Sequence, residues 1–90
     1  MTNEQVQEAI AAMPGWSGDT TALVRDFSFA DFAEALTFVN RVAQIAEEQN
    51  HHPDIDIRYN KVRLTLTSHD AGGVTKRDLR LASSISKLEI

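Results

Sequence analysis

Hydrophobic residues along the chain recur at helical spacing in three segments and at alternating positions between them. A Thr2-x-x-Gln5 capping box opens the first predicted helix. Pro14 and Gly15 end this helix. Its predicted buried stripe comprises Val6, Ala9, Ile10 and Met13.

The pattern between residues 16 and 29 is extended rather than helical. Leu23, Phe27 and Phe29 share one parity, whereas Asp26 and Ser28 take the other. This alternation predicts a strand with one buried face. We expect residues 16–19 to form a short partner strand.

Residues 30–49 follow a helical period but carry more hydrophobic positions than one stripe needs. A helix that lies on a single sheet buries a narrower arc than two adjacent stripes form. Two interpretations stay open: part of this helix contacts another subunit, or the monomer covers the helix fully. The first stripe comprises Phe32, Ala35, Leu36, Val39, Val42, Ala43 and Ala46, and the second comprises Phe38, Val42 and Ile45.

Two alternating runs predict a β-hairpin, with its turn at Asn60 and Lys61. This turn gives a register in which every opposed pair on one face is apolar. Extended outward, the same register places His52 opposite His69 at the open end of the hairpin. The three apolar pairs are Tyr59 with Val62, Ile57 with Leu64 and Ile55 with Leu66.

The last helix follows a loop in which Gly72 and Gly73 indicate a turn. A Thr75-x-x-Asp78 capping box opens this helix. Val74 and Leu79 are placed as a hydrophobic staple, and the buried face comprises Leu81, Ile85 and Leu88. We therefore expect one α+β domain over residues 1–90, in the order α-β-β-α-β-β-α.

Composition narrows the classes of function. The formal net charge of -4 and the scattered basic residues disfavour direct binding of nucleic acid. Without cysteine, the chain has no disulfide, no thiolate nucleophile and no cysteine-ligated metal. The amino-terminal residues do not resemble a signal peptide, and no apolar run approaches the roughly 20 residues of a membrane span. We expect a cytoplasmic protein.

Three histidines, His51, His52 and His69, are the candidate catalytic residues. A histidine side chain ordinarily changes its charge near pH 6.5, so converging imidazoles suit general acid and base catalysis at about neutral pH. Pro53 is compatible with this arrangement because a proline is tolerated at the first residue of a strand.

Three other interpretations of these residues stay open. Ser68, His69 and Asp70 contain the residue types of a hydrolase triad, but adjacent residues on a strand point to opposite faces. The histidines with Asp70 could ligate a metal, although the spacing lacks His-x-His or His-x-x-x-His. His51 and His52 also suit the end of a helix, where cationic side chains are favoured by the helix dipole.

Six motifs between residues 15 and 82 occur in combination: Gly-Trp at 15–16, Phe-x-Phe-x-x-Phe from residue 27, His-His-Pro at 51–53, Tyr-Asn-x-Val at 59–62, Ser-His at 68–69 and Val-Thr-x-x-Asp at 74–78. In this combination the chain resembles the pterin-4a-carbinolamine dehydratases. The resemblance implies a four-stranded antiparallel sheet with three helices on one face, assembled as a homodimer or homotetramer. It also implies dehydration of 4a-hydroxytetrahydrobiopterin to quinonoid dihydropterin without a metal or organic cofactor. The product would be recycled for an aromatic amino acid hydroxylase.

The resemblance also assigns roles to individual residues. It implies that His51 and His69 are the acids nearest the departing hydroxyl, and that His52 binds the pterin or acts as the base. Glu47 and Asp78 match acidic positions that could orient histidines, although a capping box or a solvated helix surface also explains them. Trp16 could pack against the pterin ring, and a role as a core aromatic is an equal alternative.

One dipeptide departs from the family pattern, and one other function shares the fold. Some members follow His-His-Pro with Glu-Trp, where this chain has Asp54 and Ile55; the predicted register turns Ile55 to the core. The alternative function is a non-catalytic dimerisation or assembly module, which would not need all three histidines. This chain has all three, which favours catalysis.

Overall fold

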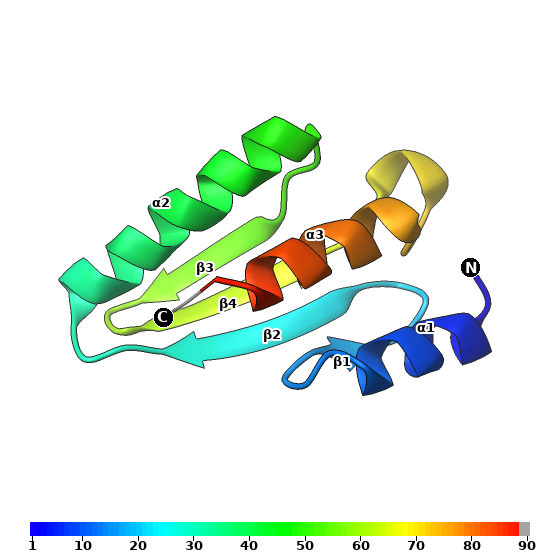
Figure 1. Ribbon diagram of the computed structural model, residues 1–90, viewed down its shortest axis with the longest axis horizontal. Coiled ribbons are helices and arrows are strands. Elements are labelled where there is room, and N and C mark those ends of the chain that lie inside the picture. The colour runs from blue at the N-terminus through cyan, green and yellow to red at the C-terminus, as the bar shows by residue number, and fades with distance from the viewer. Residues whose placement is uncertain (89–90) are drawn as a thin grey trace.

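The elements form in the predicted order around an antiparallel sheet (Figure 1). This computed structural model describes residues 1–88. Over those residues the helices are α1 (Asn3–Ala11), α2 (Phe32–Gln49) and α3 (Lys76–Ser86), with a short 3₁₀ helix η1 (His69–Ala71) before α3. The strands are β1 (Ser17–Gly18), β2 (Leu23–Ser28), β3 (Asp54–Arg58) and β4 (Lys61–Leu66), arranged side by side as β1-β2-β4-β3.

The helices cover one face of the sheet, because alternate residues of each central strand have opposite character. β2 buries Leu23 and Phe27 but exposes Asp26 on the other side. On that open side, Arg63 of β4 donates to both carboxylate oxygens of Asp26, at 2.7 and 3.0 Å. These hydrogen bonds hold the pKa of Asp26 below its usual range. The helix side forms one core, which includes Val6, Leu23, Phe38, Val42, Leu64, Leu66, Leu81 and Ile85.

Both predicted capping boxes are present, at Thr2 with Gln5 and at Thr75 with Asp78. Each satisfies amide groups that the first turn of a helix leaves without an intrahelical partner. They therefore fix where α1 and α3 begin. The second box differs from the first in its burial, because Asp78 lies in the protein interior and not on the surface.

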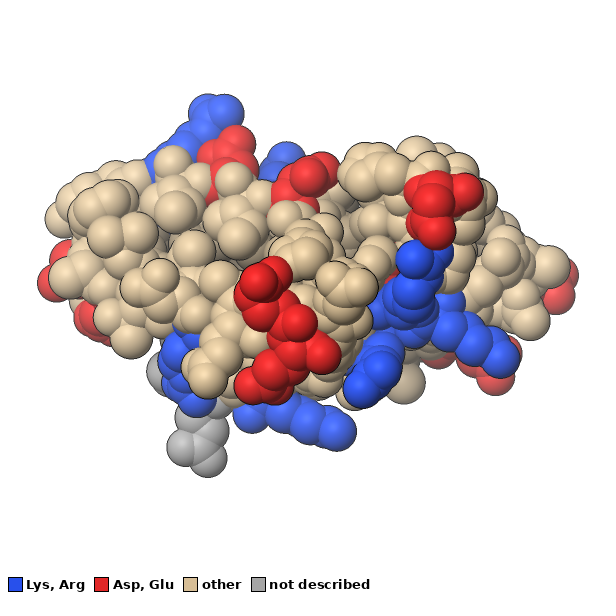
Figure 2. Space-filling model, turned by 90° about the horizontal axis from the view of Figure 1, so that it is seen from above, with Lys and Arg blue, Asp and Glu red and all other residues tan. Residues whose placement is uncertain are grey.

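The apolar arc of α2 is only partly covered. Its inner stripe is buried and comprises Ala35, Phe38, Val42 and Ala46. Phe32 and Leu36 are 46% and 36% exposed, so the interpretation that the monomer covers this helix fully is wrong. Figure 2 looks down on this side of the molecule and shows a broad area without charged side chains beside a group of acidic ones.

The β3–β4 hairpin forms as predicted, but its register differs by two residues. Ile57 lies opposite Val62 and Ile55 opposite Leu64, so the two-residue turn is Tyr59–Asn60 and not Asn60–Lys61. A shift by two keeps every side chain on its predicted face, since side chains alternate with a period of two. Ile55 does lie on the helix side, yet it is 37% exposed because β3 is an edge strand.

Asn60 explains the observed register. Its backbone carbonyl accepts from the amide of Phe29 at 2.9 Å, and its side-chain amide donates to the carbonyl of Phe29 at 2.8 Å. These bonds continue the pairing of β2 with β4 beyond the last ladder pair, Ser28 with Lys61. Asn60 is thereby fixed by a strand on the other side of β4, and Tyr59 takes the left-handed conformation, with φ of 53°.

The turn conformation predicts an unusual order of stabilities at Tyr59. A left-handed φ costs a residue with a Cβ about 1 kcal/mol and costs glycine almost nothing. Tyr59→Gly should therefore be more stable than Tyr59→Ala by about 1 kcal/mol, measured by urea unfolding. Both variants lose the same side chain, which is 66% exposed. An alanine variant as stable as the glycine variant would contradict the strained turn.

Candidate active site

After the carboxyl end of α2, the side chains of His51 and His52 point in different directions. Asn50 takes a left-handed conformation, with φ of 51° and ψ of 43°, and so ends the helix. The amide of His51 then donates back to the carbonyl of Ala46 at 3.1 Å, as in a Schellman motif. After this turn the side chain of His51 is buried and that of His52 is exposed.

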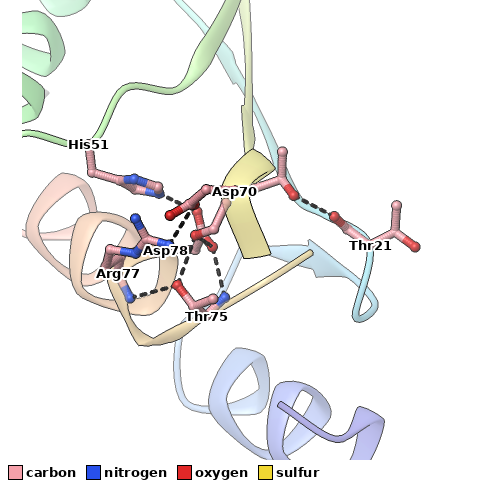
Figure 3. Close-up of polar contacts among 8 residues, drawn as sticks. Thr21, His51, Asp70, Thr75, Arg77 and Asp78 are labelled. Atoms are coloured by element: carbon pink, nitrogen blue, oxygen red, sulfur yellow. Dashed lines mark hydrogen bonds and ion pairs between the residues drawn. The ribbon is translucent and has the colours of Figure 1, made fainter. Parts of the chain in front are cut away.

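His51 points at the carboxylate of Asp78 at the start of α3 (Figure 3). Nε2 of His51 lies 2.5 Å from Oδ1 of Asp78. Asp78 is fully buried and His51 is 9% exposed. A buried charged group is tolerated only when it is paired and hydrogen bonded, so this contact is a strong constraint on both side chains.

The second oxygen of Asp78 accepts two further hydrogen bonds. The hydroxyl of Ser68 donates to Oδ2 at 2.8 Å, and the backbone amide of Thr75 donates to the same oxygen at 2.8 Å. The Thr75 bond is also half of the capping box at the start of α3. One carboxylate therefore caps α3 and links it to the segment after β4 and to the segment after α2.

His52 takes part in a different, exposed contact. Its Nε2 is hydrogen bonded to Oε2 of Glu47, one turn back along α2. The two side chains are 57% and 76% exposed, so solvent screens this pair far more than the His51–Asp78 contact. The structure thus provides His51 and His52 each with a carboxylate partner, one buried and one at the surface.

His69 is the first residue of η1, in a loop closed at its base. The amides of Ser68 and Gly73 donate to each other's carbonyls at 3.0 and 3.2 Å. Gly73 is required there because an added Cβ would lie 2.4 Å from the carbonyl oxygen of Thr20. The side chain of His69 is exposed and makes no side-chain hydrogen bond within residues 1–88.

The predicted pairing of His52 opposite His69 is wrong. β3 begins at Asp54 and β4 ends at Leu66. Neither histidine therefore belongs to the hairpin ladder. His69 is instead linked to His51 indirectly, because its chain neighbour Ser68 contacts the same carboxylate as His51.

An ion pair joins η1 to the first turn of α3. Arg77 donates to Oδ1 of Asp70 at 2.7 Å. This hydrogen bond holds the pKa of Asp70 below its usual range, and the charge of His51 acts in the same direction. The ion pair therefore ties η1 to the turn of α3 that also carries Asp78, the partner of His51.

Trp16 lies apart from this group. It is buried in the core, and its Nε1 donates to the hydroxyl of Ser86 at 2.9 Å. Ser86 ends α3, whereas Asp78 lies in its first turn. Each residue advances a helix by about 1.5 Å, so Ser86 and Asp78 are about 12 Å apart along the axis of α3. The structure brings together His51, Asp78 and the loop of His69, and it places Trp16 elsewhere.

The hydrolase and metal interpretations find no support in this arrangement. The Ser68 hydroxyl donates to Asp78 and not to a histidine, so no base is placed to activate it, and Asp70 is paired with Arg77. Over residues 1–88, no group of three histidine or acidic side chains is placed to hold a metal ion. No helix in that part of the chain is long and apolar enough to cross a membrane.

Sequence analysis missed Ser68 and Thr75 as members of this network. A signal for Ser68 was available, because it continues the parity of Val62, Leu64 and Leu66 onto the buried face. A polar residue at a core position needs a hydrogen-bond partner. The partner, Asp78, was identified as a capping residue, and its contact with Ser68 depends on the tertiary structure.

The whole described chain matches a known protein family. Residues 1–88 match the family described as pterin 4 alpha carbinolamine dehydratase. A protein of Thermomicrobium roseum named "Putative pterin-4-alpha-carbinolamine dehydratase" is 52% identical over 83 residues, which cover 92% of this chain and 89% of that protein.

Two solved structures share the fold. A "transcriptional coactivator/pterin dehydratase" of Brucella melitensis matches with a TM-score of 0.89 and 36% identity, over 94% of this chain and 93% of that chain. A pterin dehydratase-like protein identified as a RuBisCO assembly factor in the alpha-carboxysome matches with a TM-score of 0.64 and 22% identity. The second match covers 79% of this chain and 82% of that chain, and at this identity it shows a shared fold only.

The Asp70–Arg77 pair predicts pH-dependent order in η1. Asp70 has a lowered pKa in the folded protein, so the pair is intact above about pH 4 and is lost as Asp70 becomes protonated below it. Asp70→Asn should lower the hydrogen-exchange protection of the amides of residues 71–73 roughly two- to fivefold at neutral pH. In the wild type, the same protection should fall as the pH is lowered.

Asp26→Asn is the matched control, because Asp26 is also an exposed aspartate paired with an arginine at 2.7 Å. That variant should leave the amides of residues 71–73 as protected as in the wild type. Equal protection of these amides in Asp70→Asn and in the wild type would rule out a role for the ion pair in holding η1.

Proposed function

The chain belongs to the pterin 4 alpha carbinolamine dehydratase family, and we propose that it removes water from a pterin-4a-carbinolamine. The substrate by family resemblance is 4a-hydroxytetrahydrobiopterin. In this reaction the C4a–O bond breaks, the hydroxyl leaves with an added proton as water, and N5 loses its proton. A C4a–N5 double bond forms, and the product is a quinonoid dihydropterin. A reductase can convert this product back to the reduced pterin that an aromatic amino acid hydroxylase uses.

The reaction needs an acid at the hydroxyl and a base at N5, and we assign both to the histidines. His51 and His69 are the proposed acids nearest the hydroxyl, and His52 is the proposed pterin-binding group or base. Asp78 and Glu47 orient His51 and His52 in this proposal, which agrees with the two histidine–carboxylate contacts. The protein's part in the C–O cleavage and the C4a–N5 double-bond formation is proton transfer alone, so the proposal requires no metal or organic cofactor.

The observation that carries the proposal is the buried contact of His51 with Asp78. A carboxylate that holds one ring nitrogen fixes the orientation of an imidazole and leaves its other nitrogen for proton transfer. The exposed His69 begins the loop whose base, Ser68, contacts the same carboxylate. A fixed histidine and a solvent-accessible histidine on linked segments support the assignment of these two residues as acids.

We also propose that the protein assembles as a homodimer or homotetramer through the exposed side of α2. Phe32 and Leu36 are neighbours on one helix face, since residues four apart lie one above the other. Ile55 adds exposed apolar surface on the edge strand β3. Large apolar side chains that cluster at a surface favour association with another protein surface.

The alternative function is a non-catalytic dimerisation or assembly module. The exposed face of α2 favours it. Two proteins of this fold are described as a transcriptional coactivator/pterin dehydratase and as a RuBisCO assembly factor. The two functions differ in whether they require the histidines, because a binding face on α2 does not need an oriented His51.

Replacement of the acid histidines tests the catalytic proposal. His51→Gln and His69→Gln should each lower kcat by about 10²- to 10³-fold, since general acid catalysis contributes rate factors of this size. His52→Gln should raise KM more than it lowers kcat if His52 binds the pterin. The measurement is the rate of dehydration above the spontaneous rate, followed by the absorbance of the pterin.

Asp26→Asn serves as a control for these variants, because Asp26 is exposed on the open face of the sheet, opposite the helices that carry the site. Its activity should equal that of the wild type. If His51→Gln also kept wild-type kcat, or if the wild type did not accelerate dehydration, the catalytic proposal would be wrong and the assembly function would be favoured.

A charge on the exposed face of α2 tests self-association. Leu36→Glu should weaken association about tenfold or more, because an ionised side chain would have to be desolvated in the interface. Sedimentation velocity over a series of protein concentrations measures this change. Ala11→Glu adds the same charge to an exposed position of α1 and should leave association unchanged. A wild type that is monomeric at all concentrations would contradict the proposal.

A further inference from the structure

The hydrogen bonds around Asp78 have a defined direction. The hydroxyl of Ser68 lies 2.8 Å from Oδ2 of Asp78 and 2.8 Å from the hydroxyl oxygen of Thr75. A hydroxyl has one proton, and a carboxylate can only accept. Ser68 therefore donates to Asp78 and must accept from Thr75. The chain of donors runs from Thr75 through Ser68 to Asp78.

The same bonds decide which oxygen of Asp78 faces His51. Oδ2 receives the Ser68 hydroxyl and the Thr75 amide, which together occupy its two acceptor positions. Rotation of the carboxylate would break both bonds in the protein interior, since Ser68 is 1% exposed and Asp78 is fully buried. Oδ1 is thereby held toward Nε2 of His51.

An acceptor fixed in this position selects one tautomer of the imidazole. Oδ1 accepts, so Nε2 of His51 must carry the proton that lies between them. A neutral imidazole has only one N–H group, and its other nitrogen then holds a lone pair. Within residues 1–88, Nδ1 of His51 has no hydrogen-bond partner and is not among the buried unsatisfied atoms.

We propose that Ser68 is a positioning residue that, through Asp78, holds the proton of His51 on Nε2 and so makes Nδ1 the atom that exchanges a proton with the substrate. This inference rests on the proposed dehydratase function for its catalytic half. In that reaction the charged ring gives a proton from Nδ1 to the departing hydroxyl, and the neutral ring can take a proton there. Ser68 has no contact with the substrate in this mechanism.

The tautomer can be measured without substrate. In ¹⁵N-labelled protein at a pH where the ring is neutral, long-range ¹H–¹⁵N correlation spectra distinguish the protonated from the unprotonated ring nitrogen. His52→Gln and His69→Gln identify the signals of His51, since the chain has three histidines. The wild type should show His51 with the proton on Nε2. A proton on Nδ1 would overturn the inference.

Asp78→Asn should reverse the tautomer. The two donors at the Oδ2 position require an oxygen there, so the asparagine amide must turn its NH₂ group toward His51. Nε2 would then have to accept, and the proton would move to Nδ1. If this variant keeps the proton on Nε2, the donors do not orient the side chain and the inference is wrong.

Ser68→Ala removes the central donor of the chain. The Nε2 proton of His51 should exchange with water about tenfold faster, and kcat should fall about tenfold with little change in KM, as expected for loss of one hydrogen bond to a charged group. Ser68→Thr keeps the hydroxyl and should restore both values. Unchanged proton exchange in Ser68→Ala would show that Ser68 does not position Asp78.

Ser84→Ala is the matched control, because Ser84 also uses its hydroxyl in a partly buried side-chain hydrogen bond, accepting from Gln49 at 2.8 Å. It should alter neither the exchange of the Nε2 proton nor kcat. The spectra and the activity are independent: a protein with the expected tautomer but no dehydratase activity would contradict the proposed function and leave the assignment of the tautomer intact.

Discussion

The buried carboxylate of Asp78 is the interaction on which the rest of the site depends. A charged group without exposure to water is stable only if hydrogen bonds replace its hydration. Here the replacements come from three parts of the chain: the end of α2 through His51, the segment after β4 through Ser68, and the start of α3 through Thr75. The need to satisfy one carboxylate thus brings together segments that are distant in sequence, and it does so at the place where the histidines lie.

The sequence predicts the fold well because its local signals agree with one another. Alternation in the strands, helical spacing and two capping boxes all favour the same order of elements, and all were confirmed. The hairpin register could not be decided in this way. Registers that differ by two residues keep the same faces and pair apolar residues in both cases. The deciding contact joins Asn60, in the turn before β4, to Phe29, just after β2, and no local pattern contains it.

The contacts within the candidate site also join distant segments, and local patterns do not contain them. The three histidines and both acidic residues were found from spacing and from family resemblance, but the geometry drawn through the hairpin register paired His52 with His69, and that pairing was wrong. What joins the segments is a side chain with two functions. Asp78 is a capping residue, as the Thr-x-x-Asp pattern predicts, and its Oδ1 also contacts Nε2 of His51. A local pattern explains the first function so fully that it gives no reason to look for the second.

The left-handed turn at Asn50 has a consequence for how this segment can change in evolution. Between that turn and Pro53 the chain has room for two residues, and their directions are set by the backbone: the first faces inward to Asp78 and the second faces out to solvent. A residue inserted after Asn50 would take the inward position and move His51 to the outward one, whereas a deletion would leave one residue for the two environments. Substitutions here change the chemistry of one position at a time, whereas a change of length changes both. The segment is therefore constrained in its length more strictly than in its composition.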